Sequence, residues 1–341
     1  HSMFETDKRP HITVVGDLIL DRYLIGDATK LNPEQPGVVI RVDKEEDRLG
    51  GAAAVAMIAA GLGARVTLAG ILGRDEPGQR LQQLIESHGI EPHLWVDDRP
   101  TTWKQRIVAR GQLRPDRCDR ELTTPIGDHA ARFLSTAPLG DMLLVSDYGK
   151  GVCTQPLLGA LGKRALAAGT PVLVDPAQDR SWSDYGQVNL IKANQAEAIA
   201  ECSRSCFPPL RMVHHLSRCN NCHVVVTFGR RGMICADRTG YVHYLPAIPA
   251  ETRDACGAGD TVLASLGVAM LMGCPLRQAC GIASMDAAQQ VSHTGLISVK
   301  LSSESTGAWQ HPTRRLPSGT MTKPTGGDLP SIPCRDRDQA L

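Results

Sequence analysis

The residues best suited to chemistry lie in one stretch, Thr252 to Gly273, where a glycine turn runs directly into a helical pattern. Gly257 and Gly259 allow a tight turn and a close approach of the backbone to a ligand. Apolar residues then recur at three- and four-residue steps, and Gly273 followed by Pro275 marks the end of the helix. Free N–H groups and the positive end of the helix dipole meet at such a start, so the pattern predicts an anion site.

Asp260 lies in the first turn of this predicted helix. We expect its carboxylate to stay ionised, because the helix end favours the charged form. A carboxylate beside an anion site suits phosphoryl transfer to an alcohol, since the carboxylate accepts the hydroxyl proton while N–H groups stabilise the phosphoryl group. The same pattern fits a glycine turn that caps a buried helix, with Asp260 as a solvated acid.

The elements that must position this stretch read as alternating apolar strands and helices. Strands are predicted over residues 11–16, 66–70, 143–147, 172–175, 190–194 and 224–227, and helices over residues 78–88, 157–168 and 196–200. This alternation predicts an α/β fold, a doubly wound and mostly parallel sheet flanked by helices. A Rossmann dehydrogenase fits poorly, because no Gly-x-Gly-x-x-Gly follows the first strand.

Polar residues end several of the predicted strands, and they are Asp17, Asp147, Asp175, Asn194 and Thr227. In open α/β sheets, ligands bind at the edge where the carboxyl ends of the strands meet. We therefore expect these side chains to converge on one site.

Two further segments flank the first strand and helix rather than lying between them. Residues 38–42 and 103–109 read as strands. They predict a small β lid built from residues near 31–46 and 101–120. An edge strand of such a lid could pair across a homodimer.

Near the first strand, Asp17 and Asp21 are four residues apart with Arg22 beside them, and Gly50 and Gly51 open a helix. The acids either face a ligand or lie solvated in a turn. The glycine pair either admits a substrate or allows tight packing of the helix on the sheet.

Taken in order, these motifs resemble the ribokinase-like (PfkB) sugar kinases over about residues 11 to 299. In that family a Gly-Ala-Gly-Asp turn supplies the anion hole, and its Asp is the catalytic base. The resemblance assigns those roles to Gly257, Ala258, Gly259 and Asp260.

The resemblance also implies a nucleotide site. Asn194 to Glu197 is similar to the family's Asn-x-x-Glu element, which organises Mg²⁺ and phosphates through water, and Thr227 begins a segment like its nucleotide loop. The implied cofactor-binding residues are Asn194, Glu197, Thr227, Gly229, Gly232 and Ser284. The implied cofactors are ATP and Mg²⁺, with Glu197 reaching the metal through water, and K⁺ is a further candidate.

Several segments look closer still to one branch, the D-glycero-β-D-manno-heptose-7-phosphate kinases. They are residues 16–23, 32–36, 50–53 and 146–151, together with Lys104 and the Asp175-Pro176 pair. This likeness implies ATP-dependent phosphorylation of the anomeric hydroxyl of the heptose 7-phosphate, and the 1,7-bisphosphate product would feed ADP-heptose synthesis. The implied substrate-binding residues are Asp17, Asp21, Arg22, Gly50, Gly51, Lys104, Arg106, Asp147 and Lys150.

Lys104, Arg106 and Arg110 could hold the 7-phosphate through charge-assisted hydrogen bonds, or they could form an exposed face of a lid strand. Two departures fall on the sugar side. The family usually has Asn at the position of Ala54, and the branch tends to have Lys at the position of Ala177. Another sugar or sugar phosphate stays an alternative, as does a non-catalytic protein that binds nucleotide or sugar phosphate.

Bulk composition limits the other classes of function. The 341 residues include 37 basic and 36 acidic side chains, and the net charge of +1 indicates no nucleic-acid or membrane partner. The apolar runs are too short to cross a bilayer. We expect residues 1–10 to be a tag remnant and an N-terminal arm. The resemblance implies that residues 11–300 form the kinase domain, and we expect residues 301–341, rich in Ser, Thr, Pro and Gly, to be a largely disordered tail.

The chain contains eleven cysteines and no apolar signal segment, so we expect mostly reduced thiols and a cytoplasmic location. Cys202 and Cys206 form one close pair, and Cys219 and Cys222 form another. Two such pairs can make a tetrahedral zinc site, or they can be separate cysteines at a helix end and a strand start.

Overall fold

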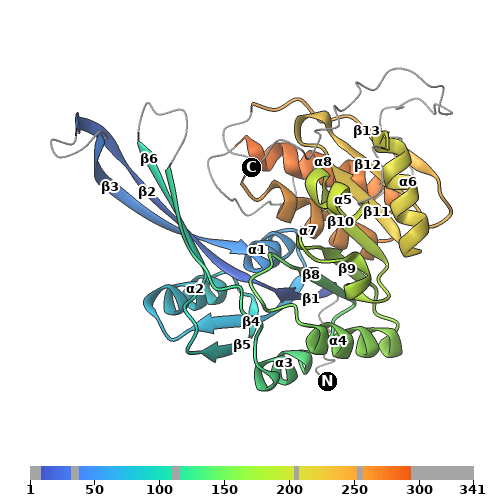
Figure 1. The fold of residues 1–341 in the computed structure, drawn as a ribbon, viewed down its shortest axis with the longest axis horizontal. Coiled ribbons are helices and arrows are strands. Elements are labelled where there is room, and N and C mark those ends of the chain that lie inside the picture. The colour runs from blue at the N-terminus through green and yellow to red at the C-terminus, as the bar shows by residue number, and fades with distance from the viewer. Residues whose placement is uncertain (1–8, 32–37, 110–115, 203–206, 252–255, 293–341) are drawn as a thin grey trace, which may run out of the picture.

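The computed structural model describes residues 9–31, 38–109, 116–202, 207–251 and 256–292. These residues form a nine-stranded sheet flanked by helices, and a separate four-stranded sheet that projects from it (Figure 1). The strand order of the large sheet is β13-β12-β11-β10-β9-β8-β1-β4-β5. The strands are β1 His11–Gly16, β4 Arg65–Gly73, β5 Glu91–Asp97, β8 Met142–Ser146, β9 Val172–Asp175, β10 Leu190–Asn194, β11 His223–Thr227, β12 Met233–Ala236 and β13 Val242–Leu245.

Every pairing from β5 across to β11 is parallel, and only the β11–β12 and β12–β13 pairings at one edge are antiparallel. Helices cover both faces of the parallel part, so its strands are continuous apolar runs rather than alternating ones. The helices are α1 Ala52–Gly61, α2 Glu76–Ser87, α3 Asp128–Ser135, α4 Gln155–Ala168, α5 Gln195–Cys202, α6 Pro209–Asn220, α7 Ala258–Leu271 and α8 Leu276–Val291, with 3₁₀ turns η1 Trp182–Tyr185 and η2 Gly229–Arg231. The predicted α/β class and mostly parallel sheet are confirmed.

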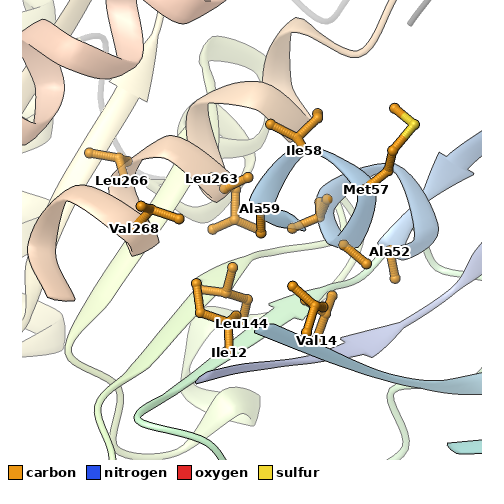
Figure 2. Packing of buried hydrophobic residues seen from close by; sticks show 14 of the residues in the cluster. Ile12, Val14, Ala52, Met57, Ile58, Ala59, Leu144, Leu263, Leu266 and Val268 are labelled. Atoms are coloured by element: carbon orange, nitrogen blue, oxygen red, sulfur yellow. The ribbon is translucent and has the colours of Figure 1, made fainter. Parts of the chain in front are cut away.

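The side chains of the central strands alternate between two cores. Ile12 and Val14 of β1 and Leu144 of β8 face a core shared with α1, α2, α7 and α8 (Figure 2). Val15 and Val145 face the opposite side, where α3 and α4 pack. A third cluster joins β10 and β11 to α5 and α6. Within the first core, α7 packs against both α1 and α8, so it is a buried helix rather than a surface one.

The second sheet is the predicted lid, with the strand order β3-β2-β6-β7. Its strands are β2 Leu18–Leu31, β3 Val38–Gly51, β6 Trp103–Ala109 and β7 Asp116–Arg120. The prediction included β3, β6 and β7 but left out β2, which begins two residues after β1 ends. The chain therefore passes directly from the main sheet into the lid, and β2 and β3 extend well beyond the body of the molecule (Figure 1).

The strand register brings the polar strand ends together, as expected. Gly16, Ser146 and Asp175 are successive register partners across β1, β8 and β9. Asn194 and Thr227 are partners across β10 and β11. The predicted carboxylates at 17 and 147 directly follow the first two of these residues, so all of these groups lie along one edge of the sheet.

The sequence analysis missed several helices and strands, and some of its expectations concern residues that the structure does not describe. Helices α3, α6 and α8 and strands β5, β12 and β13 were not predicted. Gly50 and Gly51 end β3, and Gly51 is also the N-cap of α1, so the helix does begin directly after the paired glycines. The first eight residues, parts of the lid loops and the proposed 301–341 tail lie outside the described residues. Among the helices that the structure describes, none is long and apolar enough to cross a membrane.

We predict that the packing of α7 makes a large contribution to stability. Leu263 is 0% exposed in the core between α7 and α1, whereas Leu166 on α4 is 71% exposed. Leu263→Ala should lower the free energy of unfolding by about 2–5 kcal/mol, because it removes buried methyl groups and leaves a cavity. Leu166→Ala is the matched control and should change it by about 0.5 kcal/mol or less. Urea denaturation of both variants measures the difference. Equal losses would mean that α7 is not packed as described.

Candidate active site

The start of α7 has the geometry that the glycine turn predicts. Gly257 is the N-cap and adopts a left-handed conformation with φ of 73°, and as a glycine it has no side chain that could cap the first turn. Gly259 has a different role, because it lies inside the helix. A Cβ atom there would be 3.1 Å from Nζ of Lys192, so the glycine leaves room for an ammonium group beside the helix N-terminus.

Asp260 is buried, with 5% of its surface exposed, and the hydroxyl of Tyr148 donates a hydrogen bond of 2.7 Å to its Oδ1. Burial raises the pKa of Asp260 to about 7, while the Tyr148 hydrogen bond and the nearby Lys192 oppose the rise. The expectation that the helix end alone keeps this carboxylate ionised was therefore wrong. Its physical reason is burial, which outweighs the helix end, and Asp260 is poised to gain or lose a proton near neutral pH.

Lys192 is a site residue that the sequence analysis missed. It is 3% exposed on β10, and its Nζ donates to Oδ2 of Asp175 at 2.6 Å. Burial disfavours the charged form of Lys192, but the carboxylates of Asp175 and Glu197 outweigh burial and raise its pKa. The ammonium group is therefore a fixed positive charge next to the start of α7. A lysine inside an otherwise apolar strand was the available signal.

Asn194 and Glu197 close on each other at the start of α5. The Asn194 N–H donates to Oε2 of Glu197 at 2.7 Å, and the Glu197 N–H donates to Oδ1 of Asn194 at 3.0 Å. Burial, together with the charge of Asp175, raises the pKa of Glu197 to about 7. A carboxylate oxygen at this position is a hard ligand of the kind that suits Mg²⁺ held largely by water and phosphates.

The other predicted nucleotide residues lie on neighbouring elements. Thr227 ends β11 beside β10, and its hydroxyl donates to the carbonyl of Ala193 at 3.4 Å. Gly229 and Gly232 bound the turn η2, with φ of 58° and 89°. Ser284 is buried on α8, which packs near β12 and β13.

Asp17 holds a loop rather than pointing free into the site. Its carboxylate accepts N–H hydrogen bonds from Tyr148 at 2.8 Å, Lys150 at 3.0 Å and Val152 at 3.2 Å. Burial and the charge of Asp147 raise the pKa of Asp17 to about 6. The three N–H donors stabilise its charged form, so Asp17 fixes the segment that follows β8.

The carboxylate of Asp147, like that of Asp17, is held by neighbouring protein groups. Oδ2 accepts the Tyr185 hydroxyl at 2.8 Å and lies 2.9 Å from Nε of Arg180, and Oδ1 accepts the Gly149 N–H at 2.8 Å. Ala177, which stands where the similar branch tends to have Lys, is buried nearby, and its N–H donates to the Tyr185 hydroxyl. Ala54, which stands where the family usually has Asn, is fully buried in α1.

Close contacts within the protein explain why Gly50 and Gly51 are glycines. A Cβ on Gly50 would be 2.6 Å from Oδ2 of Asp21, and a Cβ on Gly51 would be 2.4 Å from the carbonyl of Asp17. Gly51 also has a φ of 57°. Tight packing against the two acids is therefore enough to require both glycines. Both acids are buried rather than solvated, because Asp21 belongs to β2 and Asp17 joins β1 to β2.

Two of the predicted basic residues reach from the lid toward the start of α7. Nζ of Lys104 lies 5.2 Å from the ring centroid of Tyr148, the side chain that contacts Asp260. Arg106 donates through Nη2 to Sγ of Cys256 at 3.4 Å, and Cys256 directly precedes the glycine turn. The lid thus places positive charge at the edge of the anion site. The third residue of this group, Arg110, lies outside the described residues.

Lys150 and Arg22 make ion pairs. Nζ of Lys150 lies 2.7 Å from Oε2 of Glu121, just after β7, so this pair joins the lid to the body. Arg22 contacts Asp47 at 2.7 Å and Glu76 at 3.0 Å, at the base of the lid.

Only three of the four cysteines considered for a zinc site lie within the described residues. Cys202 and Cys222 are buried, Cys219 is exposed with its Sγ 3.5 Å from Nε2 of His215, and Cys206 lies outside the described residues. Within the described ranges, no group of three or more His, Cys, Asp or Glu side chains could hold a metal ion.

Comparison with known proteins places this site in a family. The model of the pfkB family carbohydrate kinases matches residues 9–303, which is most of the chain. The chain belongs to that family. The site described above lies entirely inside the matched region.

Among curated relatives, the "Bifunctional protein HldE" of Caulobacter vibrioides is 38% identical over 299 residues, covering 83% of this chain and 60% of the relative. The protein of the same name from Shewanella sediminis is 36% identical over 301 residues, covering 86% of this chain and 62% of the relative. The chain thus spans about three fifths of the length of the curated relatives it matches.

Solved structures show the same fold at lower sequence similarity. Phosphofructokinase-2 from Escherichia coli, in complex with substrates and products, superimposes with a TM-score of 0.73 at 18% identity, covering 89% of this chain and 98% of that one. Ribokinase from Arabidopsis thaliana, complexed with ribose and ATP, gives a TM-score of 0.67 at 19% identity, covering 88% and 98%. The ribokinase-like fold is therefore shown.

We predict that the buried state of Asp260 costs stability at neutral pH. Its folded-state pKa of about 7 lies above the ordinary value of 3.8. Between these two values the unfolded chain releases the proton while the folded chain retains it, so the folded state loses stability as pH rises from about 4 to 7. Asp260→Asn removes this titration.

The Asp260→Asn variant should match the wild type near pH 4 and should become more stable by a few kcal/mol above pH 7. Denaturant unfolding measured across this pH range tests the expectation. Asp128→Asn, which changes an exposed first-turn acid on α3, is the control and should show no such trend. A constant difference between wild type and Asp260→Asn at every pH would contradict the burial of this carboxylate.

Proposed function

We propose that the protein is an ATP-dependent sugar kinase in which Asp260 removes the proton from the acceptor hydroxyl. The observation that carries the proposal is a buried carboxylate in the first turn of a helix whose N-cap is a glycine. Burial raises the pKa of this carboxylate to about 7. A base with a pKa close to the working pH suits general base catalysis. Membership in the carbohydrate kinase family supports the same assignment.

The start of α7 would stabilise the transferring phosphoryl group. The N–H groups of Ala258 and Gly259 belong to the first turn, where they have no partner within the helix. The Lys192 ammonium group lies beside Gly259 and is held there by Asp175. Positive charge fixed in advance at the place where negative charge develops lowers the barrier without reorganisation.

Nucleotide binding is assigned to the adjoining edge of the sheet. Asn194 and Glu197 at the start of α5, with Thr227 on the next strand, would organise the ATP phosphates. Glu197 would hold Mg²⁺ through water, and the metal would neutralise phosphate charge when bound. Gly229, Gly232 and Ser284 would line the rest of the nucleotide site. K⁺ as a further ion, and the cytoplasmic location, stay predictions.

For the acceptor we infer D-glycero-β-D-manno-heptose 7-phosphate, phosphorylated at its anomeric hydroxyl for ADP-heptose synthesis. The sequence strings that resemble this branch support the choice, and so does the identity to relatives named HldE. We assign Asp21, Asp147 and Lys150 to binding the sugar, as the resemblance implies. The substitutions at Ala54 and Ala177 leave another sugar phosphate as the alternative.

The lid supplies groups that fit a sugar phosphate. Lys104 and Arg106 project from β6 toward Tyr148 and Cys256, so they could bind the 7-phosphate with charge-assisted hydrogen bonds. Arg22 is engaged by Asp47 and Glu76, and we assign it to bracing the base of the lid.

We also infer a homodimer formed through the lid. β3 is an edge strand of the lid sheet and exposes Val39 and Val42. An exposed edge strand with apolar side chains is a template for pairing with a second strand.

Replacing Asp260 with Asn should lower kcat by about two to four decades, because Asn cannot accept the proton. The KM for ATP should change little, since Asp260 faces the acceptor rather than the nucleotide. Steady-state ADP release measures both constants, with Asp128→Asn as the control for a first-turn acid elsewhere. A folded Asp260→Asn enzyme that kept more than about a tenth of the wild-type kcat would exclude Asp260 as the base.

A substrate panel tests the acceptor. The heptose 7-phosphate should have the highest kcat/KM against fructose, ribose and fructose phosphates. Arg106→Gln should raise the KM for the heptose phosphate by about 10- to 100-fold, the usual effect of losing a hydrogen bond to a charged group. Arg117→Gln changes the exposed register partner of Arg106 on β7 and should leave KM unchanged. A much better substrate elsewhere in the panel would refute the heptose assignment and leave the family assignment intact.

A further inference from the structure

Tyr148 makes a contact that the proposed mechanism does not yet use. Its hydroxyl donates to Oδ1 of Asp260 at 2.7 Å, and Tyr148 lies two residues after the end of β8. A carboxylate has two oxygens, so one held by a donor leaves the other to receive a proton. We propose that Tyr148 is a positioning residue, which holds Oδ1 of Asp260 so that Oδ2 faces the acceptor hydroxyl. This inference rests on the proposed kinase function.

The surroundings of Tyr148 fix its position on several sides. Its backbone N–H donates to Oδ2 of Asp17 at 2.8 Å, which ties the segment to the end of β1. Gly149, the next residue, has a left-handed φ of 69° and its N–H donates to Asp147 at 2.8 Å. The ammonium group of Lys104 lies 5.2 Å from the Tyr148 ring centroid. The hydroxyl is therefore delivered to Asp260 by an anchored loop.

The contact also has an electrostatic consequence. The charged groups that face Asp260 are Asp175 on β9, Lys192 on β10 and Asp21 on β2, in addition to the phenol of Tyr148. A hydrogen bond donated to a carboxylate stabilises its charged form and lowers its pKa. Burial and the charge of Asp260 raise the pKa of Tyr148 well above 10, so the phenol keeps its proton across the working range. Tyr148 thus keeps the base ionised at a lower pH than burial alone would allow.

Tyr148→Phe removes the donor and keeps the ring. The acid limb of kcat/KM for the sugar phosphate, at saturating ATP, should move to higher pH by about one to two units, the shift expected when a carboxylate loses a hydrogen bond. At pH 7, where the wild-type base is half ionised, the value should fall by about 5- to 50-fold, and it should recover in part at pH 9. The KM for ATP should stay unchanged. The substrates titrate in the same way with every variant, so a difference in the acid limb between two variants reports ionisation of the enzyme.

Tyr185→Phe is the matched control, because Tyr185 is a buried tyrosine that donates to Asp147 rather than to Asp260. Its acid limb should stay at the wild-type pH. If Tyr148→Phe proves unstable in a thermal melt, 3-fluorotyrosine at position 148 keeps the shape and donates more strongly. That substitution should move the acid limb to lower pH.

The possible failures are distinguishable. A wild-type enzyme that releases ADP but shares its acid limb with the Tyr148→Phe or fluorotyrosine variant would overturn the role of Tyr148 and leave the kinase proposal standing. A wild-type protein that phosphorylates no sugar or sugar phosphate of the panel would overturn the proposed function, and this inference with it. An equal shift in Tyr185→Phe would also overturn the inference, because the effect would not depend on contact with Asp260.

Discussion

The candidate site depends on one constraint, the burial of the Asp260 carboxylate at the start of a helix that is itself inside the core. α7 packs between α1 and α8, so its N-terminus cannot move without disrupting the largest apolar cluster. Burying a carboxylate opposes folding, because the charged form loses its hydration. A cost of this kind is typical of functional sites, where stability is given up for reactivity.

Other side chains at the same edge of the sheet surround the buried carboxylate of Asp260 with charged and hydrogen-bonding groups. Lys192 and Asp175 form a buried ion pair next to the glycine turn, and the hydroxyl of Tyr148 donates to the carboxylate of Asp260. Asp17 receives three backbone N–H groups, so it orders the segment that carries Tyr148. Since these contacts come from successive parallel strands, the strand register itself sets the geometry of the site.

Much of this could be predicted from local patterns. Continuous apolar runs ending in polar residues predicted the parallel sheet and the edge where those residues converge, and Gly257 proved to be left-handed as a tight turn requires. Properties that depend on distant partners could not be predicted. Asp260 is protonated more readily than its helix position suggests because of burial, and Lys192 is paired across strands with a residue 17 positions away.

The misses in the fold have similar physical causes. β2 mixes apolar and charged residues and is fixed by pairing with β3 and β6 rather than by its own pattern. α3 has only eight residues, too few for a periodic pattern to stand out. Gly50 and Gly51 suggested a route for substrate, yet the space beside them is taken by Asp21 and by the backbone of Asp17, which only the three-dimensional structure reveals.

The most direct test of the account is a crystal structure with a non-hydrolysable ATP analogue, Mg²⁺ and the heptose 7-phosphate. We predict that the acceptor hydroxyl lies within hydrogen-bond distance, about 3 Å, of Oδ2 of Asp260. The terminal phosphate should lie against the N–H groups of Ala258 and Gly259 with the Lys192 ammonium group beside it. An acceptor hydroxyl that contacts another base, or a terminal phosphate bound away from the start of α7, would contradict the account.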